Sequence, residues 1–485
     1  MPVSAVSSAA PTTQELVGVR PFGWRDRIGY MLGDVGNNLT FFLQSAFFLI
    51  FYTNVMGISP GHVGTLLFGA RILDAFTDIG AGRLIDTLRP GRSGRFRPWL
   101  LRFMVPVAVA TVLMFSPILQ DGSYAARLTW MVVTYILWGA VCYTLVNIPY
   151  GSMVSVISTR PGQRASLSVF RSLGGYLGFL GLAGLLPLFV YVQVDGSSEI
   201  SGSRMMLAAI VCGVLAIACY TLCFLGVRER VRTPPTPRGE RAGPRTLFLA
   251  LVSNRALTGI IAASLCMLIA MTLLASMLPY VYNEVFDRGQ LLSLANIVGL
   301  VPVLAFLPFA AALARRFGKR EIGVLGMTLA TLAGLVLLGV RTDSPYVFTV
   351  GYAVLMLGYA AMESLIWAVI SDVIDVQEIR TGERNDATIY ALHSWSRKIG
   401  QAVAGGLSGW TLGWIGYEAA LGQGAEQSPS VLGGIYALAT GAPAVLLGAA
   451  GLILALWYPL SKKRVQGNVA LLEERRAATH RTRTP

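Results

Sequence analysis

Apolar stretches of about twenty residues recur along the chain and are separated by short polar segments. A helix of about that length spans the hydrocarbon core of a bilayer. Twelve such stretches begin near residues 28, 61, 98, 126, 167, 204, 250, 289, 320, 345, 386 and 433. The pattern predicts an all-α membrane protein with twelve transmembrane helices.

The segment between the sixth and seventh stretches divides the chain into two halves. Pro234, Pro235 and Pro237 lie there among six arginines, so no apolar helix can continue through it. We therefore expect a tail at 1–24, a six-helix half at 25–228, a basic linker at 229–247, a second six-helix half at 248–460 and a basic tail at 461–485. Secondary transporters built in this way bind their substrates at the midplane, between the halves.

Composition and charge agree with a membrane protein and indicate its orientation. Apolar residues make up 54% of the 485 residues and charged residues 13%, and the mean hydropathy is +0.60. The net charge of +14 comes from clusters after every second stretch, at 89–97, 160–164, 228–245, 315–320 and 462–464. Basic residues stay on the cytoplasmic side. This predicts a multi-pass protein of the bacterial inner membrane with both termini in the cytoplasm, and it argues against nucleic acid as a partner.

Two acids, Asp74 and Asp78, lie in the second stretch. Residues four apart share one face of a helix. A carboxylate at the bilayer centre costs about 2.5–3.5 kcal/mol, so something must compensate the pair. We expect a coupling cation, either a proton or sodium. An ion pair between Arg71 and Asp74 that only fixes the helix is the alternative.

The fourth stretch supplies further oxygen ligands. Thr144 and Asn147 are three residues apart and share a face of the predicted helix. Hydroxyl and amide oxygens suit a small hard cation, so these residues complete a cation site if the fourth helix faces the second. Otherwise Thr144 bonds only to its own backbone.

Two adjacent cations, Arg397 and Lys398, lie in the eleventh stretch. Adjacent residues point about 100° apart on a helix, so only one of them can face a given partner. We expect Lys398 to link the carboxylates to a substrate. Arg171, in the fifth stretch, is expected either to bind a substrate carboxylate or to pair with a neighbouring helix.

The remaining candidates for substrate binding are polar or aromatic. They are Asp34 and Asn38 in the first stretch, Tyr143 in the fourth, Trp367 in the tenth and Trp395 in the eleventh. Amides and acids can recognise hydroxyl groups, and flat aromatic faces suit sugar rings. For each tryptophan, simple packing is the alternative. Glycines at 174, 175, 178, 400, 405, 406 and 409 predict close helix contacts.

Several motifs together resemble the glycoside–pentoside–hexuronide:cation symporter family, which has the major facilitator fold and includes melibiose and glucuronide carriers. The motifs are Gly33-Asp34-Val35-Gly36-Asn37-Asn38, Asp74-Ala75-Phe76-Thr77-Asp78, Gly94-Arg95-Phe96-Arg97-Pro98-Trp99, Leu145-Val146-Asn147-Ile148-Pro149-Tyr150-Gly151 and Arg397-Lys398-Ile399-Gly400-Gln401. The resemblance covers residues 25–465, and the motifs are most similar to those of the glucuronide carriers.

The resemblance implies that Asp74 and Asp78 hold the coupling cation, with Thr144 and Asn147 beside them. It also implies that Asn38, Arg171, Trp367 and Lys398 lie near a sugar cavity. Melibiose carriers have acids where this chain has Asn38 and Asn147. Since a hard cation such as sodium is held by charge count, this difference favours a proton.

These observations predict a cation-coupled symporter of a glycoside or glucuronide-like solute that works by alternating access. An exporter or a carrier of lipids or natural products on the same fold is the alternative. The sequence shows no nucleophile–base pair, metal-ligand cluster or phosphate loop, so we expect no enzymatic activity and no cofactor. The expected partners are a sugar-like solute and the lipid bilayer, and the protein is expected to act as a monomer.

Overall fold

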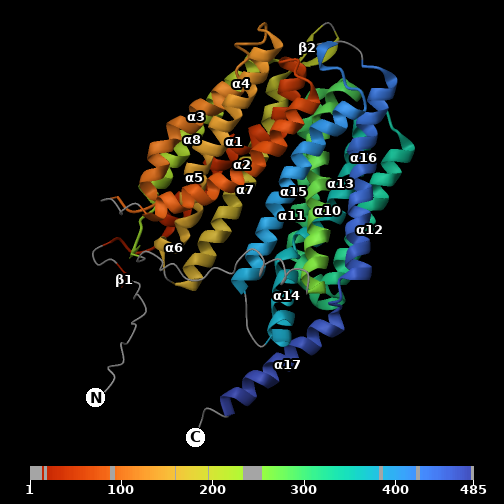
Figure 1. The fold of residues 1–485 in the computed structure, drawn as a ribbon. Helices are drawn as coiled ribbons and strands as arrows, with labels where there is room; N and C mark the ends of the chain where they lie inside the picture. Colours follow the sequence, from red (N-terminus) through yellow and green to blue (C-terminus); the bar gives the residue numbers. More distant parts are fainter. Residues whose placement is uncertain are drawn as a thin grey trace.

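Nearly all of the residues described in the computed structural model are helical (Figure 1). The structure describes residues 14–15, 19–87, 93–158, 160–194, 196–232, 254–381, 386–421 and 427–481. Most of the predicted linker, the basic residues 89–92 and the ends of both tails lie outside these ranges.

The first half contains six membrane crossings. They are α1 (Trp24–Ile50) continued by the π turn η1 (Phe51–Val55); α2 (Pro60–Thr87); α3 (Arg97–Met114); α4 (Tyr124–Ile136) continued by η2 (Leu137–Tyr143), α5 (Thr144–Ser152) and α6 (Val154–Ile157); α7 (Pro161–Val190); and α8 (Gly202–Gly226).

The second half repeats the plan. Its crossings are α10 (Arg255–Tyr280) continued by the π turn η3 (Val281–Val285); α11 (Leu292–Phe317) after η4 (Gly289–Leu291); α12 (Lys319–Val340); α13 (Pro345–Glu363) with α14 (Ile366–Thr381); α15 (Asp386–Trp414); and α16 (Pro429–Leu452) with η6 (Ile453–Trp457). The short helix η5 (Ala419–Leu421) precedes α16, and α17 (Lys462–Arg481) follows it.

These helices confirm the predicted twelve crossings. Within the described residues, ten segments are long and apolar enough to span a bilayer by length and composition. The other two crossings, α2 and α15, are equally long but carry the charged residues discussed above. Their charge is compatible with a membrane only because they face other helices rather than lipid along much of their length.

Glycines allow the helices to approach closely, as predicted. A Cβ on Gly409 of α15 would lie 2.6 Å from the Cα of Gly64 on α2, so the backbones of the two halves touch there. Within the first half, a Cβ on Gly178 of α7 would lie 3.0 Å from the Cβ of Asn38 on α1. Close contacts of this kind bring polar side chains of α1, α2, α7 and α15 into one space.

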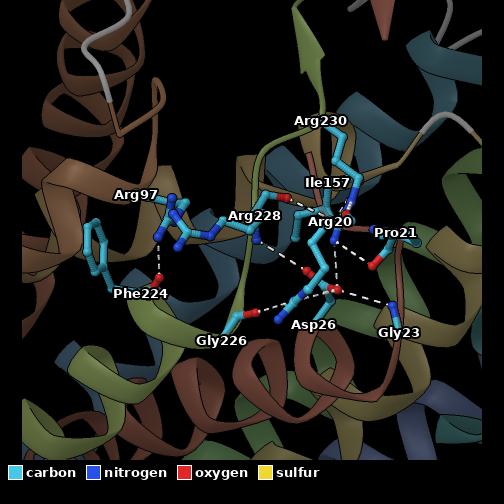
Figure 2. Close-up of polar contacts among 10 residues, drawn as sticks. All are labelled: Arg20, Pro21, Gly23, Asp26, Arg97, Ile157, Phe224, Gly226, Arg228 and Arg230. Carbon is cyan, nitrogen blue, oxygen red and sulfur yellow. Dashed lines mark hydrogen bonds and ion pairs between the residues drawn. The ribbon is translucent and has the colours of Figure 1, made fainter. Parts of the chain in front are cut away.

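A buried acid anchors the start of α1. Asp26 is fully buried, and its carboxylate accepts hydrogen bonds from Arg20 (2.9 Å), Arg230 (2.8 Å) and the backbone N–H groups of Gly23 and Arg228 (Figure 2). Multiple charged donors compensate the buried charge. Arg230, which belongs to the predicted linker, is thereby attached to the first half.

Two short sheets lie at opposite ends of the bundle. The strands β1 (Gln14–Glu15) and β4 (Val231–Arg232) pair antiparallel near the end that carries both termini (Figure 1). The hairpin of β2 (Tyr191–Val194) and β3 (Ser197–Ile200) joins α7 to α8 at the other end, which we call the hairpin end.

Hydrogen bonds between the two halves gather at the hairpin end. Gln290 donates to the carbonyl of Tyr191 at 3.2 Å, and Asn296 on α11 donates to the carbonyl of Ala183 on α7 at 3.2 Å. The Trp410 indole on α15 donates to Thr65 on α2 at 3.1 Å. The structure therefore shows the two halves joined at the hairpin end.

Candidate functional site

A polar cavity of about 470 Å³ lies where the helices of the two halves meet. Helices α1, α2, α5 and α7 and the π segment η2 form most of its wall, and α15 of the second half closes one side. Its volume is typical of a site for a small molecule. Asp34, Asn38, Asp74, Asp78, Tyr143, Thr144, Asn147, Arg171 and Lys398 were predicted from the sequence, and all of them line it.

The two carboxylates of α2 both face this cavity. Asp74 lies 3.6 Å from the guanidinium of Arg71, measured from Oδ2 to Nη1. Asp78 Oδ2 accepts a hydrogen bond from Lys398 Nζ at 2.7 Å. In this conformation fixed bases therefore compensate both acids, and Lys398 rather than Arg397 is the base that reaches them from α15.

The pair between Asp78 and Lys398 is only partly shielded from solvent. The side chains of Asp78 and Lys398 are 23% and 43% exposed. Ion pairs with such exposure are much weaker than buried ones, because water competes for both charges. Lys398 can therefore leave Asp78 at a modest cost when another cation binds there.

One carboxylate oxygen of this group has no partner. Asp74 Oδ1 is buried and makes no hydrogen bond to any described residue. It faces Gly139 in η2, where an added Cβ would lie 3.7 Å away. A buried carboxylate oxygen without a donor favours binding of a proton or a cation. The donor set is therefore compatible with the predicted coupling ion.

Thr144 connects the fourth crossing to α2. Its hydroxyl lies 3.2 Å from Asp78 Oδ1 and 3.1 Å from the carbonyl of Gly139. Both alternatives considered from the sequence, a link to the carboxylate and a bond to the backbone, are thus present. Asn147 lies on the same wall, one turn further along α5. The fourth helix does face the second, as the predicted cation site requires.

The second polar group in the cavity joins α1 to α7. Arg171 Nε donates to Asp34 Oδ1 at 3.1 Å, and Asn38 Nδ2 donates to Asp34 Oδ2 at 3.1 Å. The Arg171 guanidinium also lies 5.5 Å from the ring centre of Tyr150. Arg171 therefore pairs with a neighbouring helix, but 44% of its side chain is exposed and its other donors remain available to a solute.

The charges in the cavity balance. Asp34, Asp74 and Asp78 contribute three negative charges, and Arg71, Arg171 and Lys398 contribute three positive charges. One additional cation would leave one base without its acid. Such a base can bind a solute that carries a carboxylate or several hydroxyl groups.

The two predicted tryptophans lie outside this cavity. Trp367 and Trp395 are 49% and 58% exposed, on α14 and α15, and neither lines the space described above. The ring of Trp367 packs edge-on against His393, at 5.4 Å between ring centres. Their contact with a substrate stays a prediction that this conformation does not support.

Phe41, Trp138 and Gln401 are among the lining residues that were not predicted. Phe41 and Trp138 both stack on Tyr143, with ring centres 5.9 and 5.1 Å away. They provide the aromatic surface that was expected from Trp367 and Trp395. Gln401 lies three residues after Lys398, so helical spacing alone would have placed it on the same face.

Comparison with known proteins agrees with this architecture. A family model described as MFS/sugar transport protein matches residues 29–462. The glucuronide carrier protein homolog of Escherichia coli K12 is 32% identical over 93% of this chain and 96% of its own length. The isoprimeverose transporter of Lactiplantibacillus pentosus is also 32% identical, over 87% of each chain.

Solved structures share the fold at low sequence identity. A D-xylose–proton symporter aligns with a TM-score of 0.61 and 14% identity, covering 90% of this chain and 98% of that protein. A bacterial homologue of the lysosomal transporter Spinster aligns with a TM-score of 0.65 and 13% identity, covering 93% and 99%. This chain is a membrane transporter and not an enzyme, and it belongs to the MFS/sugar transport family.

Proposed function

We propose that this protein carries a glycoside or glucuronide-like solute across the bacterial inner membrane together with a cation. Its relatives named for glucuronide and isoprimeverose support a sugar-like substrate. The observation that carries the proposal is the arrangement of Asp74, Asp78 and Lys398 in a cavity between the two halves. Both termini would face the cytoplasm, as the basic clusters predict, and a single chain would suffice for transport.

The coupling follows from competition for Asp78. A cation that binds beside Asp78 and the unpartnered Asp74 Oδ1 displaces the Lys398 ammonium. The released ammonium, together with the free donors of Arg171, then attracts the acidic or hydroxyl groups of the solute. Cation and solute thus stabilise the same arrangement, and each raises the affinity for the other by the same factor.

A proton is the cation we favour over sodium. The cation pocket contains two carboxylates, one hydroxyl group and one amide, and two bases stand beside it. Sodium needs several oxygen ligands at once, whereas a proton needs a single basic oxygen. Asp74 Oδ1 is such an oxygen.

Export is the second candidate function. A relative from Salmonella typhimurium, named as a putative 2,3-dihydroxypropane-1-sulfonate exporter, is 30% identical over 98% of this chain. The same cavity serves either direction, because the gradients of ion and solute decide the net flow.

Uptake into membrane vesicles tests the proposal. We expect labelled glucuronides or glycosides to accumulate under an imposed inward proton gradient, and sodium to have a smaller effect. Asp74→Asn and Asp78→Asn should abolish accumulation against a gradient. Lys319→Gln, which removes an equally short ion pair outside the cavity, is the matched control and should retain accumulation. Unchanged accumulation in both aspartate variants would refute the proposed cation site.

A further inference from the structure

The first helix of each half ends in the same unusual way. Helix α1 widens into the π turn Phe51–Val55, and α10 widens into the π turn Val281–Val285. A residue with positive φ follows each turn at the same distance: Gly57 at 61° and Asp287 at 50°. The two turns are therefore equivalent positions of an internal repeat that relates the halves.

The hydrogen bonds that close the two turns also correspond. The N–H of Ile58 donates to the carbonyl of Tyr52 at 2.8 Å, and the N–H of Arg288 donates to that of Tyr282 at 2.7 Å. A π turn adds a residue to the helix and is often found at functional sites. Its presence in both halves indicates a role for this geometry at the hairpin end.

The fourth residues of the two turns meet. Asn54 Nδ2 donates to Glu284 Oε1 at 2.6 Å, which joins the halves where the equivalent turns face each other. Tyr417, which follows α15, donates to Asn54 Oδ1 at 2.8 Å and to Glu284 Oε1 at 3.3 Å. The hydroxyl of Thr53, the residue before Asn54, lies 2.7 Å from that of Tyr280, the last residue of α10.

This cluster is largely buried and contains one acid, the half-buried Glu284, without an ion pair to a described residue. Asn54 and Tyr417 are 8% and 7% exposed, and Thr53 and Tyr280 are fully buried. Glu284 makes no ion pair with a described residue and depends on neutral donors, including its neighbour Asn283 at 3.1 Å. A carboxylate that loses these donors gains hydration when the cluster opens, so the contact can be made and broken reversibly.

The cluster lies beyond the central cavity, and two of the helices that lead to it, α1 and α15, line that cavity. Asn54 follows Phe41 of the cavity wall by thirteen residues, which is about 20 Å along a helix. Tyr417 follows the hairpin end of α15, the helix that carries Lys398 and Gln401. The cluster therefore joins the two halves between the cavity and the hairpin side.

We propose that Asn54, Glu284 and Tyr417 form the latch that closes the transport route at the hairpin end, and that the bond between Asn54 and Glu284 must break before the cavity opens there. This inference rests on the alternating access of the proposed function. Because opening can be measured without a solute, the two proposals can fail independently.

Labelling of a reporter cysteine tests the latch. Ala75 lies on the cavity wall between Asp74 and Asp78, so Ala75→Cys reports which side of the membrane reaches the cavity. A membrane-impermeant maleimide is applied to vesicles of either orientation, and the protein with Ala75 retained gives the background from its native cysteines. With the latch intact, labelling is expected mainly from the side of the termini.

Variants that weaken the latch should reverse this preference. Asn54→Ala, Glu284→Ala and the milder Tyr417→Phe are each expected to raise labelling from the hairpin side by about tenfold, the effect of losing one charge-assisted hydrogen bond. Asn283→Ala is the matched control, because Asn283 contacts Glu284 from the same half and should not alter the preference.

Two results of the labelling experiment would refute the latch. The first is that Tyr417→Phe and any folded variant of Asn54 or Glu284 are still labelled mainly from the side of the termini. The second is that Asn283→Ala raises labelling from the hairpin side as much as the variants of Asn54, Glu284 and Tyr417 do. If the labelling is as expected but the protein takes up no sugar, the latch is supported and the proposed substrate is wrong.

Discussion

Replacing Lys398 by Gln should increase the affinity of the cavity for its coupling cation. The ammonium of Lys398 occupies Asp78 Oδ2 at 2.7 Å, so a cation that binds there must first displace it. Glutamine retains most of the side-chain volume but no charge. The variant therefore removes an internal competitor and leaves the carboxylates in place.

The distance and the exposure of the pair set the size of the effect. Two unit charges 2.7 Å apart attract with about 1.5 kcal/mol at the dielectric constant of water and about 6 kcal/mol at an effective value of 20. Since Lys398 is 43% exposed, the lower figure applies. About 1.5 kcal/mol corresponds to roughly tenfold in affinity.

Thermal unfolding of the purified protein measures this affinity without any solute. A cation that binds only the folded state raises Tm as its concentration increases. We expect the midpoint of this rise to move by about one logarithmic unit in Lys398→Gln, to higher pH for protons or to lower concentration for sodium. The midpoint is compared rather than Tm itself, because the substitution also changes intrinsic stability.

Lys319→Gln provides the matched control. Lys319 contacts Asp372 at the same distance of 2.7 Å, but this pair does not line the cavity. Its loss should lower stability without moving the cation midpoint. An unchanged midpoint in Lys398→Gln, or an equal movement in Lys319→Gln, would show that Lys398 does not compete with the cation.

Four further predictions follow from the contacts described above. Asp74→Asn should abolish accumulation of solute in vesicles while exchange of labelled for unlabelled solute continues, because exchange needs no net ion release. Arg171→Gln should raise the solute KM about tenfold with a smaller effect on the maximal rate, since one charged hydrogen bond to the solute is lost. Gly409→Ala should reduce thermal stability by about 1–3 kcal/mol through overpacking against α2, whereas Gly413→Ala, whose Cβ would lie 3.6 Å from Gly61, should be nearly neutral. Asp26→Asn should lower stability by about 3–5 kcal/mol, because it leaves Arg20 and Arg230 without their acid, and yet leave the cation midpoint unchanged.

The number of crossings was predictable because bilayer thickness imposes one length on every helix. The π turns at Phe51–Val55, Leu137–Tyr143 and Val281–Val285 were not predicted. One added residue is a small change in an apolar stretch of more than twenty, and the wider turn is stabilised by tertiary contacts. The equivalence of the turns at Phe51–Val55 and Val281–Val285 lies in their three-dimensional geometry, which the apolar pattern of the sequence does not record.

Helical spacing predicted those site residues that share a helix face. Asp74 and Asp78 point into one cavity, and Lys398 does so without Arg397, as the 100° separation of neighbours requires. Trp367 and Trp395 were assigned to the substrate by residue type alone. Which way such a ring faces depends on the rotation of its helix within the bundle, and a single sequence does not specify that rotation.

The dependence of solute-driven ion flux on Asp78 tests the central claim most directly. Purified protein is reconstituted into vesicles that contain a pH-sensitive dye, a transported sugar or glucuronide is added outside, and the internal pH is followed without an imposed gradient. We predict that the solute acidifies the interior with the native chain, and that Asp78→Asn abolishes this change while solute exchange persists. Solute-driven acidification that survives in Asp78→Asn would contradict the account.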